Sequence, residues 1–168
     1  MPSLLRFAAE RRLQSTRAMR SYALSIVIVL AAGCGPTVAE LRSDGACQTW
    51  VEGVAQNWVA RVDGNQAVLR AALGERPGAF FVHATEIYVP SAFGPQRMGS
   101  YQNGALMLHT ALGDDGPYSM LGERASIARS AFGELVVDHN EHCRPPQIAL
   151  GSVTLFLAYA ASQSSVHH

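Results

Sequence analysis

An uncharged stretch from Ser21 to Ala39 is the feature that most restricts what the start of this chain can become. It follows Arg20 and contains an apolar run of about a dozen residues, which ends in small residues before Cys34. A membrane-spanning helix needs about twenty consecutive apolar residues, so this run is short for that role. A basic residue, a short apolar run and then small residues are the order found in an export signal. We therefore expect residues 1–33 to be an export signal, with a permanent transmembrane helix or a buried core helix as alternatives.

The end of this run resembles the lipobox of bacterial lipoproteins. It reads Leu30-Ala31-Ala32-Gly33-Cys34, and it departs from the family in having Ala31 where leucine is most usual. The resemblance implies that Cys34 receives a diacylglyceryl group, that the chain is cleaved before it, and that the new N-terminus is acylated. Two or three acyl chains would anchor the protein stably to a membrane. Gly35 stands where aspartate would resemble an inner-membrane retention signal, so we expect the outer membrane. An ordinary signal peptide that leaves Cys34 unmodified is the alternative.

The remaining length of the 168-residue chain suits one small domain. We expect translation to start at Met19, because residues 1–18 would make an unusually long basic segment before the apolar run. Residues 34–42 are expected to form a lipidated tether, residues 43–162 a folded domain, and residues 163–168 a tail.

The zero formal net charge averages two differently charged parts. The part before Cys34 holds five arginines and one acid, whereas the part from Cys34 onward holds eight arginines and twelve acids. Nucleic-acid binding needs clustered positive charge, which this acidic part lacks, so we expect no nucleic-acid partner. The chain contains no lysine, which excludes Schiff-base chemistry and a phosphate-binding P-loop lysine.

The first part of the domain is predicted to be helical. Apolar residues recur at steps of three and four from Trp50 to Val62, after a possible helix start at Ser43-Asp44-Gly45. A second short helix is expected over Gln66–Leu73. The alternative is a β-hairpin that turns at Asp63-Gly64.

The second part is predicted to be mainly strands. Phe80–Val89, Ala105–Leu112 and Ile148–Ala160 are expected to be strands, the last one central and buried on both faces. Residues 90–102 are expected to form a loop, residues 113–117 a turn, and residues 127–136 a helix. The predicted fold class is α+β, in which N-terminal helices precede a mainly antiparallel sheet in a single small domain.

Assigning Cys34 to lipid leaves Cys47 and Cys143 as a pair. The bacterial envelope is oxidising, so we expect a disulfide that joins the first helix to the loop before the last strand. Two reduced, buried cysteines are the alternative.

The densest group of potential metal ligands runs from Asp138 to Cys143. His139 and His142 could share one face of a turn and bind zinc, with Glu141 or Asp138 as the acid–base partner. The alternative is a polar loop, which Pro145-Pro146 directly afterwards favours. Asp114-Asp115-Gly116 resembles part of a calcium loop, but a turn fits its spacing better. Three aromatic residues could line a ligand pocket or form part of the core: Tyr88, Phe93 and Tyr101.

Three functions follow from these observations. The first is a non-enzymatic, lipid-anchored envelope protein without a cofactor, whose domain binds a partner protein or a small apolar ligand. The second is a metal-dependent hydrolase that uses His139, His142 and Glu141. The third is a structural module of a larger envelope assembly.

Overall fold

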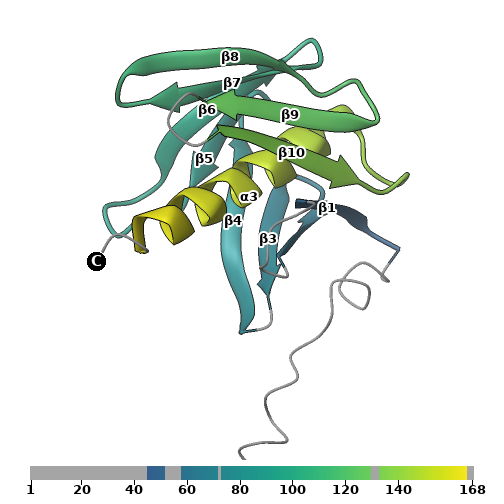
Figure 1. Ribbon diagram of the computed structural model, residues 1–168, viewed down its shortest axis with the longest axis horizontal. Helices are drawn as coiled ribbons and strands as arrows, with labels where there is room; N and C mark the ends of the chain where they lie inside the picture. Colours follow the sequence, from purple (N-terminus) through teal and green to yellow (C-terminus); the bar gives the residue numbers. More distant parts are fainter. Residues whose placement is uncertain (1–44, 52–57, 72, 130–132, 166–168) are drawn as a thin grey trace, which may run out of the picture. The chain divides into compact units, whose positions relative to one another are not determined.

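The computed structural model describes residues 45–51, 58–71, 73–129 and 133–165. These residues form ten strands followed by one helix (Figure 1). The strands are β1 (Cys47–Val51), β2 (Val59–Asp63), β3 (Gln66–Ala71), β4 (Gly74–Val82), β5 (Glu86–Val89), β6 (Gln96–Gln102), β7 (Ala105–Thr110), β8 (Gly113–Ser119), β9 (Arg124–Arg129) and β10 (Gly133–His139). The helix is α3 (Pro145–Ser165).

All ten strands belong to one antiparallel sheet, with the order β8-β7-β6-β5-β4-β3-β2-β1-β10-β9. Strands β1 to β8 follow one another as a meander, and the hairpin of β9 and β10 returns to pair β10 with β1. The two edge strands, β8 and β9, also contact each other. The sheet is therefore curved until it is nearly closed, and α3 runs through the space that it surrounds (Figure 1).

The inner face of the sheet is built by alternation. Along β2, Ala60 and Val62 are buried against the helix side, and along β10, Leu135 and Val137 take the same role. Successive side chains of a strand point to opposite faces, so every second residue of these strands enters the core. Apolar residues of α3 belong to the same core and pack against these strand residues.

Helix α3 begins at a pair of prolines. Proline is favoured in the first turn of a helix, and the side chain of Gln147 caps the start by accepting a hydrogen bond from the Arg144 N–H at 3.0 Å. All residues from Ile148 to Phe156 are buried, so this part of α3 is covered on every side. Within the described residues, no helix is both long and apolar enough to cross a membrane.

Small residues let the helix and the sheet approach closely. A Cβ on Gly151 of α3 would lie 2.1 Å from the Thr49 hydroxyl on β1, and a Cβ on Gly78 of β4 would lie 2.6 Å from the Thr154 side chain. The Thr154 hydroxyl accepts a hydrogen bond from the Ala79 N–H at 2.9 Å. The helix thus has one position against β1 and β4 that these contacts define.

The predicted α+β class is wrong, because the described residues are mainly strand and no helix among them precedes the sheet. The residues expected to form two N-terminal helices instead form β1, β2 and β3 where they are described. The apolar steps of three and four came from joining two strands across residues 52–57, which lie outside the described part. The alternative hairpin at Asp63-Gly64 is correct, since β2 and β3 pair across it.

The last expected strand, Ile148–Ala160, is also wrong, because it lies within α3. A helix buried on all sides is apolar all round and loses the periodicity that identifies an amphipathic helix. The expected helix over 127–136 is a β-hairpin, in which β9 pairs with β10. The strand Ala105–Leu112 is correct as β7, although the structure ends it at Thr110.

Three further predicted segments differ from the structure. The expected strand Phe80–Val89 is divided between β4 and β5, which pair across residues 83–85. The expected loop 90–102 contains β6, and the expected turn 113–117 lies within β8. Glycine and proline suggested loops here, but both residues are tolerated in strands at bulges and edges, and β8 is an edge strand.

Candidate functional site

Cys47 and Cys143 form a disulfide, as the sequence predicts. Their Cα atoms lie 4.5 Å apart although 96 positions separate them in the chain. The elements that the bond joins differ from the expectation, because it connects strand β1 to the turn before helix α3. It therefore fastens the start of the helix to β1, which lies between β2 and β10 in the sheet. The predicted lipidation site, Cys34, lies outside the described residues.

His139, at the end of β10, has both ring nitrogens next to backbone carbonyls. Its Nδ1 atom lies 3.1 Å from the Asn140 oxygen, and its Nε2 atom lies 3.2 Å from the Gly122 oxygen. These contacts hold the ring across the gap between β10 and the turn before β9. The ring therefore has a structural role that does not depend on a metal.

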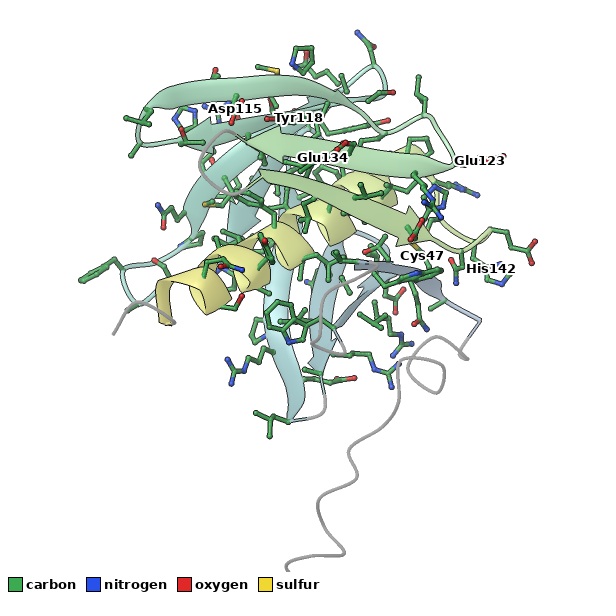
Figure 2. All side chains as sticks on the ribbon, viewed as in Figure 1. Cys47, Asp115, Tyr118, Glu123, Glu134 and His142 are labelled. Carbon is green, nitrogen blue, oxygen red and sulfur yellow. A yellow bond between two sulfur atoms is a disulfide. The ribbon has the colours of Figure 1, made fainter. Side chains whose placement is uncertain are left out.

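The other members of the predicted metal group point to different surroundings. Asp138 is buried and pairs with Arg124 at 2.8 Å, whereas Glu141 and His142 are exposed in the turn that leads to α3. Figure 2 shows His142 beside Cys47 at this end of the sheet. Among the described residues, no group of three or more His, Cys, Asp or Glu side chains is placed to hold a metal ion. Metal binding by His139 and His142 stays a prediction.

The paired aspartates of β8 bind neighbours within the sheet. Asp114 contacts His109 of β7 through a hydrogen bond, and Asp115 accepts a hydrogen bond from the Tyr118 hydroxyl at 2.9 Å (Figure 2). The alternation of β8 directs these two carboxylates to different partners. This arrangement fits a strand segment rather than the calcium loop that the sequence resembled.

The three candidate pocket aromatics are not brought together. Tyr101 packs inward against Phe81, with 6.4 Å between ring centroids, and Tyr88 lies on the outer face opposite Phe80 at 6.3 Å. Phe93 is fully exposed in the loop between β5 and β6. None of the three lines the hollows described below.

Two tyrosines have raised pKa values for different reasons. The hydrogen bond from the Tyr88 hydroxyl to Glu86, at 3.1 Å, raises the pKa of Tyr88, and partial burial and the Glu86 charge add to this effect. Burial raises the pKa of Tyr101. Arg97 balances the Glu86 carboxylate with an ion pair at 3.2 Å, so the outer face carries a small polar array beside Phe80.

Two largely apolar hollows lie on either side of the β3–β4 hairpin. The larger, of about 520 Å³, lies where a bulge separates β3 from β4, and it is lined mainly by Ala67, Val68, Pro77, Gly78, Phe80 and Pro90. The second, of about 330 Å³, lies between this hairpin and the last turns of α3, and it is lined mainly by Trp58, Leu69, Ala71, Leu73, Ala158 and Ala161. Both volumes fall in the range of small-molecule sites.

Arg76 of β4 lines both hollows. Its neighbour Glu75 pairs with Arg70 at 3.2 Å, but no ion pair or hydrogen bond joins the Arg76 side chain to another described residue. A guanidinium at the boundary of apolar surfaces can bind a carboxylate or a phosphate through two hydrogen bonds. The arrangement can thus hold an apolar body and one acidic group.

Comparison with protein-family models, curated proteins and solved structures found no match to this chain. The candidate site therefore rests on the geometry of its own residues.

Sequence reasoning did not single out Arg76, Trp58 or the end of α3. These residues are far apart in the chain and meet only because β3, β4 and the helix are neighbours. The only local signal was the change from an apolar strand to Glu75-Arg76 directly after Gly74, which fits an ordinary charged hairpin equally well.

Proposed function

We propose that this protein is a lipid-anchored, non-enzymatic binding protein of the bacterial envelope, and that its domain binds a small, mainly apolar ligand beside Arg76. The observation that carries the ligand site is the pair of apolar hollows that share this arginine. The resemblance of Leu30–Cys34 to a lipobox supports the anchor, and Gly35 after it supports the outer membrane.

The apolar lining would supply most of the affinity for the body of the ligand. Burying apolar surface contributes roughly 25 cal/mol per Å², so a hollow of this size can bind a chain or ring system without many polar contacts. Arg76 would then select ligands that carry a negative charge at one end, because a charged partner replaces the water that solvates the guanidinium.

The ligand site is tested with dodecanoate and dodecanol as probes, using the fluorescence of Trp58, which lines the second hollow. We expect both probes to bind the wild-type protein. Ala161→Phe fills the second hollow and should weaken binding of both, whereas Gln163→Phe adds the same side chain to an exposed position of α3 that lines neither hollow.

The role of Arg76 is tested with the same two probes. Arg76→Gln should weaken dodecanoate binding by about tenfold, which corresponds to roughly 1.4 kcal/mol, and should leave dodecanol binding unchanged. Equal binding of the wild-type, Ala161→Phe and Gln163→Phe proteins would contradict the ligand site.

The anchor is tested separately by mass spectrometry of the mature N-terminus. A peptide that begins at acylated Cys34 is expected, and a mature chain that begins at any other residue would contradict the anchor.

A further inference from the structure

The structure carries three large apolar side chains that are almost fully exposed at hairpin turns. Leu73 lies between β3 and β4, Phe93 between β5 and β6, and Leu112 between β7 and β8, with exposed fractions of 92%, 102% and 95%. Because β1 to β8 form a meander, every second turn lies at the same end of the sheet. We call Leu73, Phe93 and Leu112 the apolar tips, and the end of the sheet that carries them the tip end.

The turns at the opposite end have a different composition. The three turns within the meander contain Gly64-Asn65, His83-Ala84-Thr85 and Asn103-Gly104, which are mainly the small and polar residues usual in turns. The connection from β8 to β9, at the same end, holds one exposed leucine, Leu121, with an exposed fraction of 68%. A hairpin turn by itself therefore does not require leucine or phenylalanine. The tip end therefore carries three large exposed apolar side chains, whereas the opposite end carries one, Leu121, among the described residues.

The apolar tips belong to a repeated four-residue pattern. It reads Ala71-Ala72-Leu73-Gly74, Ser91-Ala92-Phe93-Gly94 and Thr110-Ala111-Leu112-Gly113, and the final glycine has a positive φ each time. The sequence contains a fourth copy, Ser130-Ala131-Phe132-Gly133, between β9 and β10, of which residues 130–132 lie outside the described part. The glycine is explained by the backbone, whereas the large apolar residue before it is exposed at each of the three described turns, and of these only Leu73 also lines the second hollow.

Two of these turns are held by the same hydrogen bonds. The Ser91 hydroxyl accepts from the Phe93 N–H at 3.2 Å and donates to the Gly94 carbonyl at 2.6 Å. The Thr110 hydroxyl accepts from the Leu112 N–H at 3.2 Å and donates to the Gly113 carbonyl at 2.8 Å. The turns are thus preorganised, and each presents its apolar side chain outward without a conformational change.

From this geometry we propose that the tip end docks on a lipid bilayer, with each apolar tip inserted among the lipid headgroups. The turns lie on separate hairpins around the end of α3, and Figure 1 shows the turn after β5, the turn after β7 and the C-terminal end of α3 on the same side. Separate points around a rim suit a flat, deformable surface, whereas a protein partner would favour one continuous apolar patch.

The charges near the tip end are mixed, and one of them, Arg76, can contact anionic lipid headgroups. Glu75 is paired with Arg70, Asp114 and Asp115 are hydrogen-bonded to His109 and Tyr118, and Arg76 forms no ion pair or hydrogen bond with another described residue. An arginine near an anionic bilayer adds to the attraction.

The proposed anchor can reach the same membrane. The chain from Cys34 to Cys47 extends to at most about 45 Å at roughly 3.3–3.6 Å per residue. The longest strand, β4, has nine residues and spans only about 30 Å. This step rests on the proposed lipid anchor, whereas the docking surface itself does not.

The test uses the full lipidated chain in vesicles of phosphatidylethanolamine and phosphatidylglycerol. The photo-cross-linking residue benzoylphenylalanine replaces each apolar tip in turn, and mass spectrometry detects lipid adducts. Leu121 is the matched control, because it is an exposed leucine (68%) at the opposite end of the sheet. We expect adduct yields at the three tips at least about tenfold above the yield at position 121.

A second variant distinguishes docking of the tip end from attraction of the apolar cross-linking residue to the lipid. With the cross-linker at position 112, Leu73→Gln together with Phe93→Gln should lower the lipid adduct about tenfold or more, and Leu121→Gln should not change it. Equal yields at the tips and at position 121, or no lipid adducts at the tips, would overturn the proposal. Adducts to a protein instead of lipid in whole cells would also overturn it. The N-terminal peptide of the same sample shows independently whether the anchor is present.

Discussion

The hydroxyl of Thr154, in the middle of α3, accepts a hydrogen bond from the backbone N–H of Ala79 on β4 at 2.9 Å. The same hydroxyl donates to the carbonyl of Leu150, also at 2.9 Å, so it bridges the helix and the sheet. Thr154 and Ala79 are both buried, and water therefore cannot replace either bond. This contact connects two segments that lie 75 positions apart in the chain.

Thr154→Val is expected to destabilise the fold by about 1–3 kcal/mol, because the buried Ala79 N–H would lose its partner while the volume of the side chain stays almost the same. Chemical denaturation measures the change. Thr110→Val is the matched control, since the Thr110 hydroxyl also accepts from an N–H and donates to a carbonyl, but in an exposed turn. Equal losses in the two variants would contradict the bridging role of Thr154.

Gly151→Ala is expected to destabilise the fold by about 1–3 kcal/mol, because the new methyl group would lie 3.0 Å or less from three atoms of the Thr49 side chain. One of these atoms is the Thr49 Cβ, which cannot move without the backbone. Thermal or chemical unfolding measures the loss, and Gly45→Ala, with no atom within 4 Å of the added Cβ, is the control.

The same clash should be relieved by a second substitution. Thr49→Ala removes the two nearest atoms, Oγ1 at 2.1 Å and Cγ2 at 2.7 Å, and leaves only the Cβ at 3.0 Å, so the double variant should be more stable than Gly151→Ala alone. Simple additivity of two losses would contradict a direct clash.

Removing the Cys47–Cys143 disulfide is expected to lower the free energy of unfolding by about 2–4 kcal/mol, since the bond closes a long loop around nearly the whole sheet. The measurement compares unfolding of the wild-type protein with and without dithiothreitol. Cys47→Ala together with Cys143→Ala should match the reduced wild-type protein and should not respond to dithiothreitol. A large response of this double variant would show that the reductant acts elsewhere.

Glu86→Gln is expected to lower the pKa of Tyr88 toward its ordinary value, because the hydrogen bond to Glu86 is the main cause of the raised pKa. A raised pKa in the folded state means that the folded state holds the proton more tightly. The stabilising effect is therefore complete below the ordinary tyrosine pKa and is lost as the pH rises through the raised value.

Tyrosinate absorbance against pH measures this shift, with Tyr88→Phe identifying the signal of Tyr88. The pKa of Tyr101 should not change in Glu86→Gln, because its cause is burial. An unchanged Tyr88 titration would rule out Glu86 as the cause.

Parts of the fold could be read from short sequence signals. Asp63-Gly64 is a strong hairpin turn, and Cys47 and Cys143 were the natural pair once Cys34 was set aside. Both signals depend on one or two residues, although the hairpin was only the alternative to the two helices that the sequence analysis expected. The strand β7 was equally clear, because its apolar residues Leu106 and Leu108 alternate.

Helix α3 could not be identified by periodicity, because the sheet surrounds it and its buried half has no polar face. Its length was the better indication, since Ile148 to Ala160 exceeds the usual length of a strand and fits a helix. The recurring alanine–apolar–glycine turn was a stronger missed signal. Its spacing of roughly twenty residues predicts pairs of strands, and it would have placed most of the sheet.

The candidate ligand site was beyond sequence reasoning for another reason. Arg76 is one of several arginines, and only the neighbouring segments show that it lies between two apolar hollows. Such a site depends on β3, β4 and the end of α3 together, and no single segment of the sequence contains it.

The position of α3 inside the sheet also determines when the protein can fold. Within the described residues, all ten strands precede the helix in the chain, so the ribosome synthesises the strands of the sheet before the helix that fills its interior. Until then, the inward leucines, isoleucines and valines have no partner to cover them. We therefore expect the sheet to close around a core only after α3 has been synthesised, and a truncation that removes α3 to leave the sheet without the apolar side chains that fill it.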